Sequence, residues 1–214
     1  MNSFVLKLFA ASFMLIDHIG ILFFPEIMIF RILGRISFPI FAFLVVEGFM
    51  HTRNIKKYIL RIVVFGFISE IPFNMLVSGH ILCRENQNVF FTFAIGLVML
   101  WFLSNNVVPM YTNLIVAVGV LLAVLLRTDY SLYGMALIYF FYMFRESRIK
   151  YIFFVLVSLL YGGVQRAALL SVVPLWFYNG KVGPEFTHKN VIKYGFYIFY
   201  PLHMLILFDI KKII

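Results

Sequence analysis

The sequence is poor in cysteine and in charged residues. One cysteine, Cys83, occurs among 214 residues, which excludes an internal disulfide and a metal site made of several cysteines. Only 13% of the residues are charged, whereas 63% are hydrophobic and the mean hydropathy is +0.98. A soluble domain has roughly 45 to 50% apolar residues. The composition therefore predicts an integral membrane protein.

The motifs of soluble enzymes are missing as well. The sequence has no HExxH, no P-loop and no G-x-S-x-G. His51, His80 and His188 lack metal-ligand spacing, so we expect no metal. The net charge is +9, but the basic residues fall at the ends of apolar runs, which favours membrane topology over nucleic-acid binding. The first run lacks an A-x-A site and is longer than an h-region, which predicts a retained span.

Apolar runs occupy most of the chain, and they repeatedly approach the roughly 20 residues that cross a hydrocarbon core. We predict an all-α polytopic membrane protein with one domain over 1–214. It would be a single bundle of about nine transmembrane helices, some of them short, kinked or re-entrant. The stretch 149–178 contains Gly162 and Gly163 and could instead be one bent element or a re-entrant pair. The predicted spans are 4–24, 30–50, 58–78, 88–104, 107–126, 130–144, 149–162, 164–178 and 194–210.

The distribution of basic residues predicts the orientation. With the N-terminus in the cytoplasm, 11 of the 18 Lys and Arg residues fall on the cytoplasmic side, as the positive-inside rule requires. We therefore expect a multi-pass protein of the cytoplasmic membrane. The eleven residues are Lys7, Arg53, Lys56, Lys57, Arg61, Arg145, Arg148, Lys150, Lys181, Lys189 and Lys193.

Two ionisable residues, Asp17 and His18, lie side by side in the first apolar run. A charge at the centre of a lipid-facing helix costs roughly 2.5 to 3.5 kcal/mol, so such residues usually face the protein interior and carry function. His18 suits a general base because imidazole changes protonation near neutral pH. The alternative is a histidine that only donates an interhelical hydrogen bond. Adjacent helix positions point about 100° apart, so Asp17 is expected to pair with a cation on another span.

Lys7 precedes His18 by eleven positions. At about 100° and 1.5 Å per residue, the two lie on nearly the same helix face, roughly 16 Å apart along the axis. A negatively charged head group could rest on Lys7 while an extended arm carries its reactive end to His18. The alternative is that Lys7 is an ordinary interfacial anchor. Arg53, Lys56 and Lys57, in the loop after the second predicted span, are further candidates for holding phosphates.

The second run contains two arginines one turn apart, Arg31 and Arg35. Like charges on one helix face repel unless an anion lies between them, and Asp17, Glu70 or a substrate carboxylate could fill that place. Arg35 is predicted to lie deeper and to hold a carboxylate with its planar fork. Arg31, near the membrane end, could simply extend to the interface. Pro39 is predicted to kink this helix and to free backbone carbonyls.

Three more ionisable residues are candidates for a shared polar cavity. Glu47, near the cytoplasmic end of the second span, is expected to form a structural salt bridge with the basic loop that follows it. Glu70 shortly precedes the helix breaker Pro72 and is either a site residue or an ion-pair partner of Arg35. His203 is the second deep histidine, in FYIFYPLHMLILF, and its position is as compatible with packing as with function.

Five segments, in order along the chain, resemble the TraX family. They are KLFAASFMLIDHIG, GRISFPIFAFLVVEGF, NVFFTFAIGL, SLYGMALIYF and FYIFYPLHMLIL. The spacing of Lys7 and His18 is also similar to the Arg/Lys, ten residues, His arrangement of the membrane acyltransferase-3 group, and FYPLH is similar to its late Tyr-rich histidine motif. The namesake of the TraX family is implicated in N-terminal acetylation of conjugative pilin. The resemblance therefore implies an integral membrane acyltransferase.

The resemblance also implies roles for the buried residues. An acetyl group would pass from cytoplasmic acetyl-CoA to an amine or hydroxyl of a protein or glycan. The resemblance does not name this acceptor, for which a pilin-like protein and a cell-surface acceptor are the candidates. His18 and Asp17 would be catalytic, and Arg35, Glu70 and His203 would line the cavity. A proton-coupled transporter that uses the same buried charges is the alternative, although the inverted repeats typical of transporters are missing. A silent scaffold for pilus assembly would leave these charges unexplained.

Overall fold

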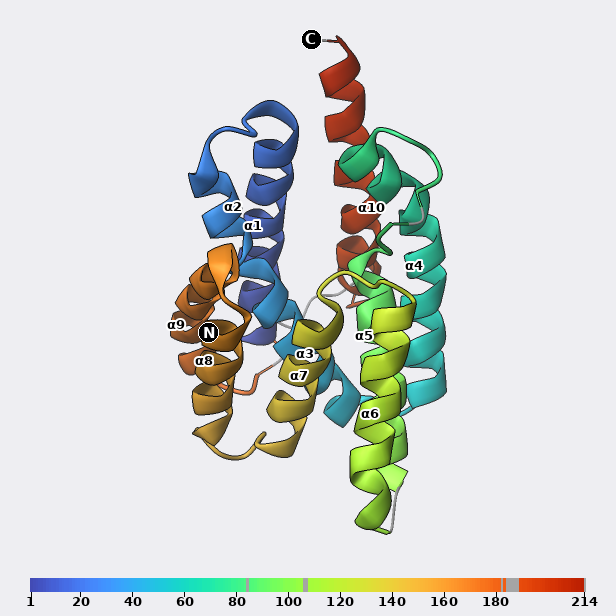
Figure 1. The fold of residues 1–214 in the computed structure, drawn as a ribbon, viewed down its shortest axis with the longest axis vertical. Helices are drawn as coiled ribbons and strands as arrows, with labels where there is room; N and C mark the ends of the chain where they lie inside the picture. Colours follow the sequence, from blue (N-terminus) through green and yellow to red (C-terminus); the bar gives the residue numbers. More distant parts are fainter. Residues whose placement is uncertain (84, 106–107, 182, 184–188, 214) are drawn as a thin grey trace. The chain divides into compact units, whose positions relative to one another are not determined.

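The computed structural model describes residues 1–83, 85–105, 108–181, 183 and 189–213. Helices make up the fold of these residues (Figure 1), and the only pairing of extended segments among them is an isolated bridge between Gln87 and Thr128. The all-α class is therefore confirmed. The helices are α1 (Ser3–Phe23), α2 (Met28–Gly34), α3 (Ser37–His51), α4 (Ile55–Ser78), α5 (Val89–Asn105), α6 (Met110–Leu125), α7 (Ser131–Met143), α8 (Ile149–Tyr161), the 3₁₀ helix η1 (Gly163–Ser171), α9 (Val172–Trp176) and α10 (Lys189–Ile213).

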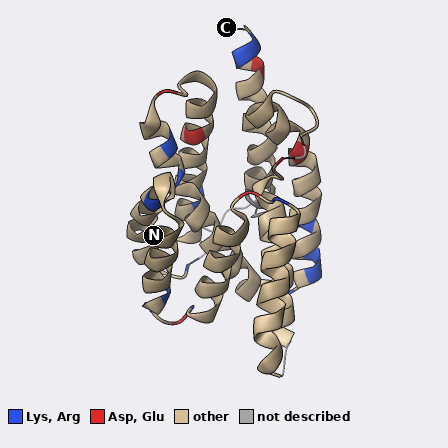
Figure 2. Ribbon diagram, viewed as in Figure 1, with Lys and Arg blue, Asp and Glu red and all other residues tan. Residues whose placement is uncertain are grey.

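Three helical stretches in the described part of the chain are long and apolar enough to cross a membrane. They are Ser3–Phe23, Met28–His51 and Ile55–Ser78. Charged residues are sparse along the ribbon (Figure 2), and α5, α6 and α7 contain no Asp, Glu, Lys or Arg. These helices are apolar but shorter, so the count of nine transmembrane spans stays a prediction.

The second apolar run is not one uninterrupted helix, because α2 ends at Gly34 and α3 begins at Ser37. Pro39 explains the position of the break. A proline has no N–H for the carbonyl four residues earlier, and its ring clashes with that carbonyl, which here belongs to Arg35. Within the first turn of α3 the missing N–H costs nothing. Pro39 thus breaks the helix about one turn before its own position. As a result, Arg35 lies directly after the C-terminal end of α2.

The sequence predicts two other helix breaks, at Pro72 and at Gly162 and Gly163, and the structure has the second but not the first. Pro72 lies inside α4, which continues to Ser78, so Glu70 is not at a helix end. The expected span 164–178 is a 3₁₀ helix followed by the short α9. Gly162 and Gly163 have φ values of +76° and +54°, which interrupt the α-helix before η1 begins.

The chain forms two compact units. Unit 1 comprises Met1–Phe41, Ile71–Leu82 and Ser158–Ile214, and unit 2 comprises Ala42–Glu70 and Cys83–Val157. Helices α3, α4 and α8 each pass from one unit into the other, so neither unit can be cut from the chain as a segment. The organisation as one domain stays a prediction.

In unit 1, α1 packs against both α2 and α10. Asn2 caps α1 by accepting a hydrogen bond from the N–H of Val5 at 2.9 Å, as N-cap residues do. α2 returns alongside α1 (Figure 1), and the two helices approach so closely that a Cβ at Gly20 would overlap the side chain of Phe30. This close approach determines which side chains of α1 face α2.

In unit 2, α5, α6 and α7 pack against one another. A Cβ at Gly96 would overlap the far end of the Ile138 side chain, so α5 and α7 also approach closely. Asn88 begins α5 by accepting from the N–H of Phe90 at 3.1 Å and donating to the carbonyl of Gly66 at 2.8 Å. The polar groups of this unit thus cap and join helices.

Candidate functional site

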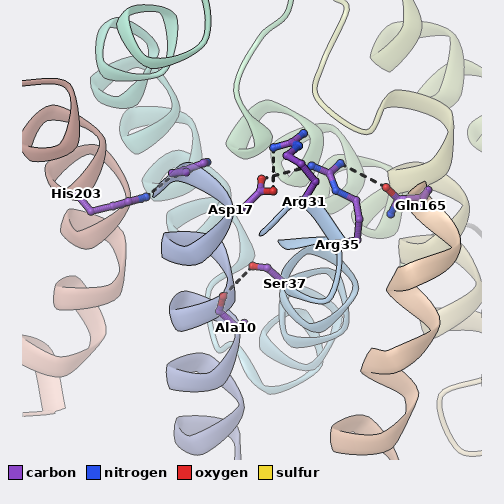
Figure 3. Close-up of polar contacts among 8 residues, drawn as sticks. Ala10, Asp17, Arg31, Arg35, Ser37, Gln165 and His203 are labelled. Carbon is purple, nitrogen blue, oxygen red and sulfur yellow. Dashed lines mark hydrogen bonds and ion pairs between the residues drawn. The ribbon is translucent and has the colours of Figure 1, made fainter. Parts of the chain in front are cut away.

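In unit 1, Asp17 holds Arg31 of α2 and Arg35, which directly follows α2. Its Oδ1 accepts from Arg31 Nη1 at 2.8 Å, and its Oδ2 accepts from Arg35 Nη2 at 3.4 Å (Figure 3). The Asp17 side chain is 11% exposed, Arg35 is 16% exposed and Arg31 is 33% exposed. Of the anions that the sequence suggests for this place, Asp17 contacts both arginines.

Gly34 makes this ion-pair cluster possible. It is the last residue of α2, and a Cβ built on it would overlap the Oδ1, Cγ and Cβ atoms of Asp17. The carboxylate can therefore reach both guanidinium groups only because residue 34 has no side chain. The sequence marks the neighbouring arginines as candidates, but nothing in it indicates this role of Gly34.

Two further hydrogen bonds fix the helix end around Arg35. Arg35 Nη1 donates to Gln165 Oε1 on η1 at 3.5 Å, and Ser37 Oγ donates to the carbonyl of Ala10 on α1 at 2.9 Å (Figure 3). Gln165 was not among the predicted site residues. The signal for it in the sequence is slight, because it is one of two glutamines in the chain and lies in an apolar run.

His18 contacts a different helix from its neighbour Asp17, as the 100° step between adjacent positions predicts. Its Nδ1 lies 2.7 Å from Nε2 of His203 on α10, and both rings are buried. The ring planes are within 5° of parallel and the centroids are 4.9 Å apart. Such a short distance between nitrogens at that centroid spacing means that the rings meet edge to edge, as a hydrogen bond in the ring plane requires.

The partners of His203 determine the direction of this hydrogen bond. His203 Nδ1 lies 2.6 Å from the carbonyl oxygen of Phe199, and a carbonyl oxygen only accepts, so His203 Nδ1 donates. A neutral imidazole has one N–H and one acceptor nitrogen. In the neutral pair, His203 Nε2 therefore accepts and His18 Nδ1 donates. His18 Nε2 is left with its lone pair and has no hydrogen-bond partner among the described residues.

Lys7 shares its helix face with His18, which confirms the expected alignment. The Lys7 ammonium lies 5.8 Å from the ring centroid of Phe196, and Phe196 precedes His203 by seven positions, or about two turns of α10. The α1 face with Lys7 and His18 thus lies against the α10 face with Phe196 and His203. One packed helix pair holds both the cation and the imidazole pair.

The remaining candidates belong to unit 2. Glu47 Oε1 lies 3.6 Å from Arg145 Nε, so Glu47 forms an ion pair with an arginine far along the chain. Glu70 Oε2 accepts from the side chain and the N–H of Asn88, and its pairing with Arg35, a residue of unit 1, stays a prediction. Arg53, Lys56 and Lys57 are exposed in this unit.

The described fold and site define an all-helical protein with apolar helices of membrane-spanning length and a buried cluster of ionic and imidazole side chains. A family model described as TraX protein matches residues 3–211. The chain belongs to the TraX family, which confirms the resemblance inferred from the five segments.

The chain is similar to two curated proteins. The chain is 29% identical over 240 residues to the probable fimbrial assembly protein FimC, serogroup H1, of Dichelobacter nodosus, covering 98% of this chain and 96% of that protein. It is 29% identical over 109 residues to the uncharacterized protein RP591 of Rickettsia prowazekii (strain Madrid E), covering 51% of this chain and 40% of that protein. No solved structure matches the chain.

Proposed function

We propose that this protein is an integral membrane acyltransferase that moves an acetyl group from cytoplasmic acetyl-CoA to an amine or hydroxyl of a protein or glycan. The observation that carries the proposal is the direction of the hydrogen bonds from His18 to His203 and from His203 to Phe199. They leave an unprotonated imidazole nitrogen, His18 Nε2, inside a chain of very few charges. A general base needs such a nitrogen.

The proposed transfer uses His18 twice. His18 Nε2 removes the proton from the acceptor nitrogen or oxygen while the lone pair of that atom attacks the thioester carbonyl carbon. The carbon–sulfur bond then breaks, and the leaving thiolate takes the proton back from His18. Between the two steps His18 is an imidazolium whose Nδ1–H still donates to His203. His203 is therefore a positioning residue, in the way that a third group orients the base of a catalytic triad.

Asp17 has a different role in this proposal. Because its two oxygens are engaged by Arg31 and Arg35, it assembles the α1 and α2 side of the site and does not orient His18. Lys7 would provide a cation for the donor on the helix face that leads to His18. Arg53, Lys56 and Lys57 stay candidates for the donor phosphates through their exposed charges.

The membrane setting supports the proposal in two ways. The chain has helices of membrane-spanning length. Its basic residues favour a multi-pass arrangement with the N-terminus and Lys7 on the cytoplasmic side, and acetyl-CoA is available on that side. The relative from Dichelobacter nodosus is named for fimbrial assembly, so a pilin-like protein is the first acceptor class to test. Glycans at the cell surface are the second.

Labelled acetyl transfer tests this function. Membranes that contain the full chain would be given acetyl-CoA labelled in the acetyl group, and label on proteins and glycans would be measured. His18→Gln keeps the size of the side chain but lacks a basic nitrogen, so it should reduce transfer by at least the roughly hundredfold that general bases contribute. His80→Gln is the matched control, because His80 is exposed in a loop. Undiminished transfer by His18→Gln would overturn the assignment.

A further inference from the structure

A pocket of about 450 Å³ opens beside the ion-pair cluster in unit 1. Arg31 and Arg35 line it from the α2 side, and Gly163 and Gln165 line it from the first turn of η1. The residues that line the pocket include no Asp or Glu. The lining of the pocket is thus rich in hydrogen-bond donors and in positive charge.

Arg31 has donors to spare at this pocket. A guanidinium has five N–H groups, and among the described residues only Nη1 of Arg31 is engaged, with Asp17. The three charged side chains Asp17, Arg31 and Arg35 together carry a net charge of +1. A partly buried excess of positive charge is costly unless an anion approaches it, and a guanidinium fork matches carboxylate and phosphate geometry.

Gln165 provides an independent sign of a missing acceptor. Its side chain is only 7% exposed. Its Oε1 accepts from Arg35, but its Nε2 is buried with no hydrogen-bond partner in the described part of the chain. A buried donor without a partner costs free energy, and native proteins rarely keep one. An oxygen of a bound anion in the pocket would satisfy this amide.

We propose that this pocket binds an anionic group, a carboxylate or a phosphate, carried by a substrate of the protein. The anion would be held by Arg31, Arg35 and the Gln165 amide. The identity of the carrier rests on the proposed acyl transfer, but binding of the anion does not. Asp17 then links the two parts of the site, because it holds the arginines while its neighbour His18 reaches the other helix.

Thermal unfolding of the full chain in detergent tests the anion site without turnover. Inorganic phosphate and acetate are the probes, and chloride at equal ionic strength is the baseline. A ligand that binds the folded state raises the melting temperature with its concentration, so at least one probe should raise it in the wild-type protein. If neither probe raises it above the chloride baseline, the site does not exist.

Two substitutions at Gln165 sharpen the test. Gln165→Glu places a carboxylate beside Arg35, so it should raise the melting temperature without added anion and abolish the shift caused by the probe. Gln165→Leu removes the amide donor and should weaken anion binding roughly tenfold, since a hydrogen bond to a charged group contributes about 1.4 kcal/mol or more. Gln87→Glu makes the same charge change in unit 2 and should keep the wild-type shift. An unchanged shift in both Gln165 variants would overturn the proposal.

Calorimetric binding of coenzyme A identifies the source of the anion. If the pocket holds a donor phosphate, Arg31→Met should weaken coenzyme A binding at least tenfold, because the guanidinium with most unused donors is removed. If the pocket holds a carboxylate of the acceptor, Arg31→Met should bind coenzyme A like the wild type but lose the acetate shift. Either result supports an anion site, and a variant that keeps both the coenzyme A affinity and the probe shift refutes it. Failure of the His18→Gln transfer experiment would leave these results standing.

Discussion

The two units of the molecule use buried polar side chains differently. In unit 2, Asn88 caps α5 and joins it to α4 through Gly66 and Glu70, so each polar group serves a neighbouring helix end. In unit 1, charged and imidazole side chains from α1, α2, η1 and α10 meet around Asp17 and His18. Both units keep some buried polar atoms without a partner among the described residues, such as Glu70 Oε1 in unit 2. In the described part of unit 1, however, arginine and amide donors line a pocket, and a basic imidazole nitrogen on the neighbouring helix is also unused. This difference is why we assign the chemistry to unit 1.

The largest expected effect is on the stability of unit 1 when Asp17 loses its charge. Asp17→Asn leaves Arg31 and Arg35 without their shared carboxylate, and removal of one partner from a buried ion pair costs about 3 to 5 kcal/mol. The partial exposure of Arg31 favours the lower value. Thermal unfolding in detergent measures the loss. Asp209→Asn changes an exposed aspartate on α10 and should unfold like the wild type, and equal behaviour of the two variants would contradict the cluster.

The next largest effect compares two glycines, one in each unit. Gly34→Ala forces a methyl group into the Asp17 carboxylate, which cannot move without leaving the arginines, so we expect a loss of about 2 to 3 kcal/mol. Gly96→Ala meets the far end of the flexible Ile138 side chain and should cost clearly less. Both melting temperatures can be measured in one series. A larger loss for Gly96→Ala would reverse the comparison.

A substitution of Glu70 tests whether its negative charge is needed for stability and for acetyl transfer. Glu70→Gln keeps an oxygen that can accept from Asn88, so we expect a loss of at most about 1 kcal/mol and full acetyl transfer. The alternative transporter function needs this carboxylate as a proton site. Proton-coupled flux in liposomes that disappears in Glu70→Gln, together with no transfer in the wild type, would favour the transporter.

The smallest effect is expected at Lys7. Its contact with the Phe196 ring contributes roughly 0.5 to 1 kcal/mol at a partly exposed site, so Lys7→Met should change the melting temperature little. The proposed contact with the donor predicts a higher KM for acetyl-CoA with kcat preserved. An unchanged KM would mean that Lys7 is an interfacial anchor only.

The sequence was sufficient to predict the pairs that helical periodicity controls. Arg31 and Arg35 share a face because they are one turn apart, and Lys7 and His18 share one because eleven positions make about three turns. The break at Arg35 also follows from Pro39, once the effect is counted four residues back. Each of these features depends on one local segment.

The contacts between distant segments could not be predicted in the same way. Gln165 meets Arg35 across 130 positions, and no periodic pattern links them. Glu70 meets Asn88 because the start of α5 lies against α4, which only the packing determines. Gly34 has its role because of an atom on another helix.

Nitrogen-15 NMR of the histidine rings tests the central claim most directly, because the claim concerns which nitrogen of His18 has the proton. Full-length protein labelled at histidine would be measured near neutral pH in lipid, and the His18 signals would be assigned by their loss in His18→Gln. We predict that His18 Nδ1 is protonated and that His18 Nε2 is not. His203→Phe removes the acceptor of the Nδ1 proton, so in this variant part of the His18 population should have its proton on Nε2 instead. A proton on His18 Nε2 in the wild-type protein would contradict the account.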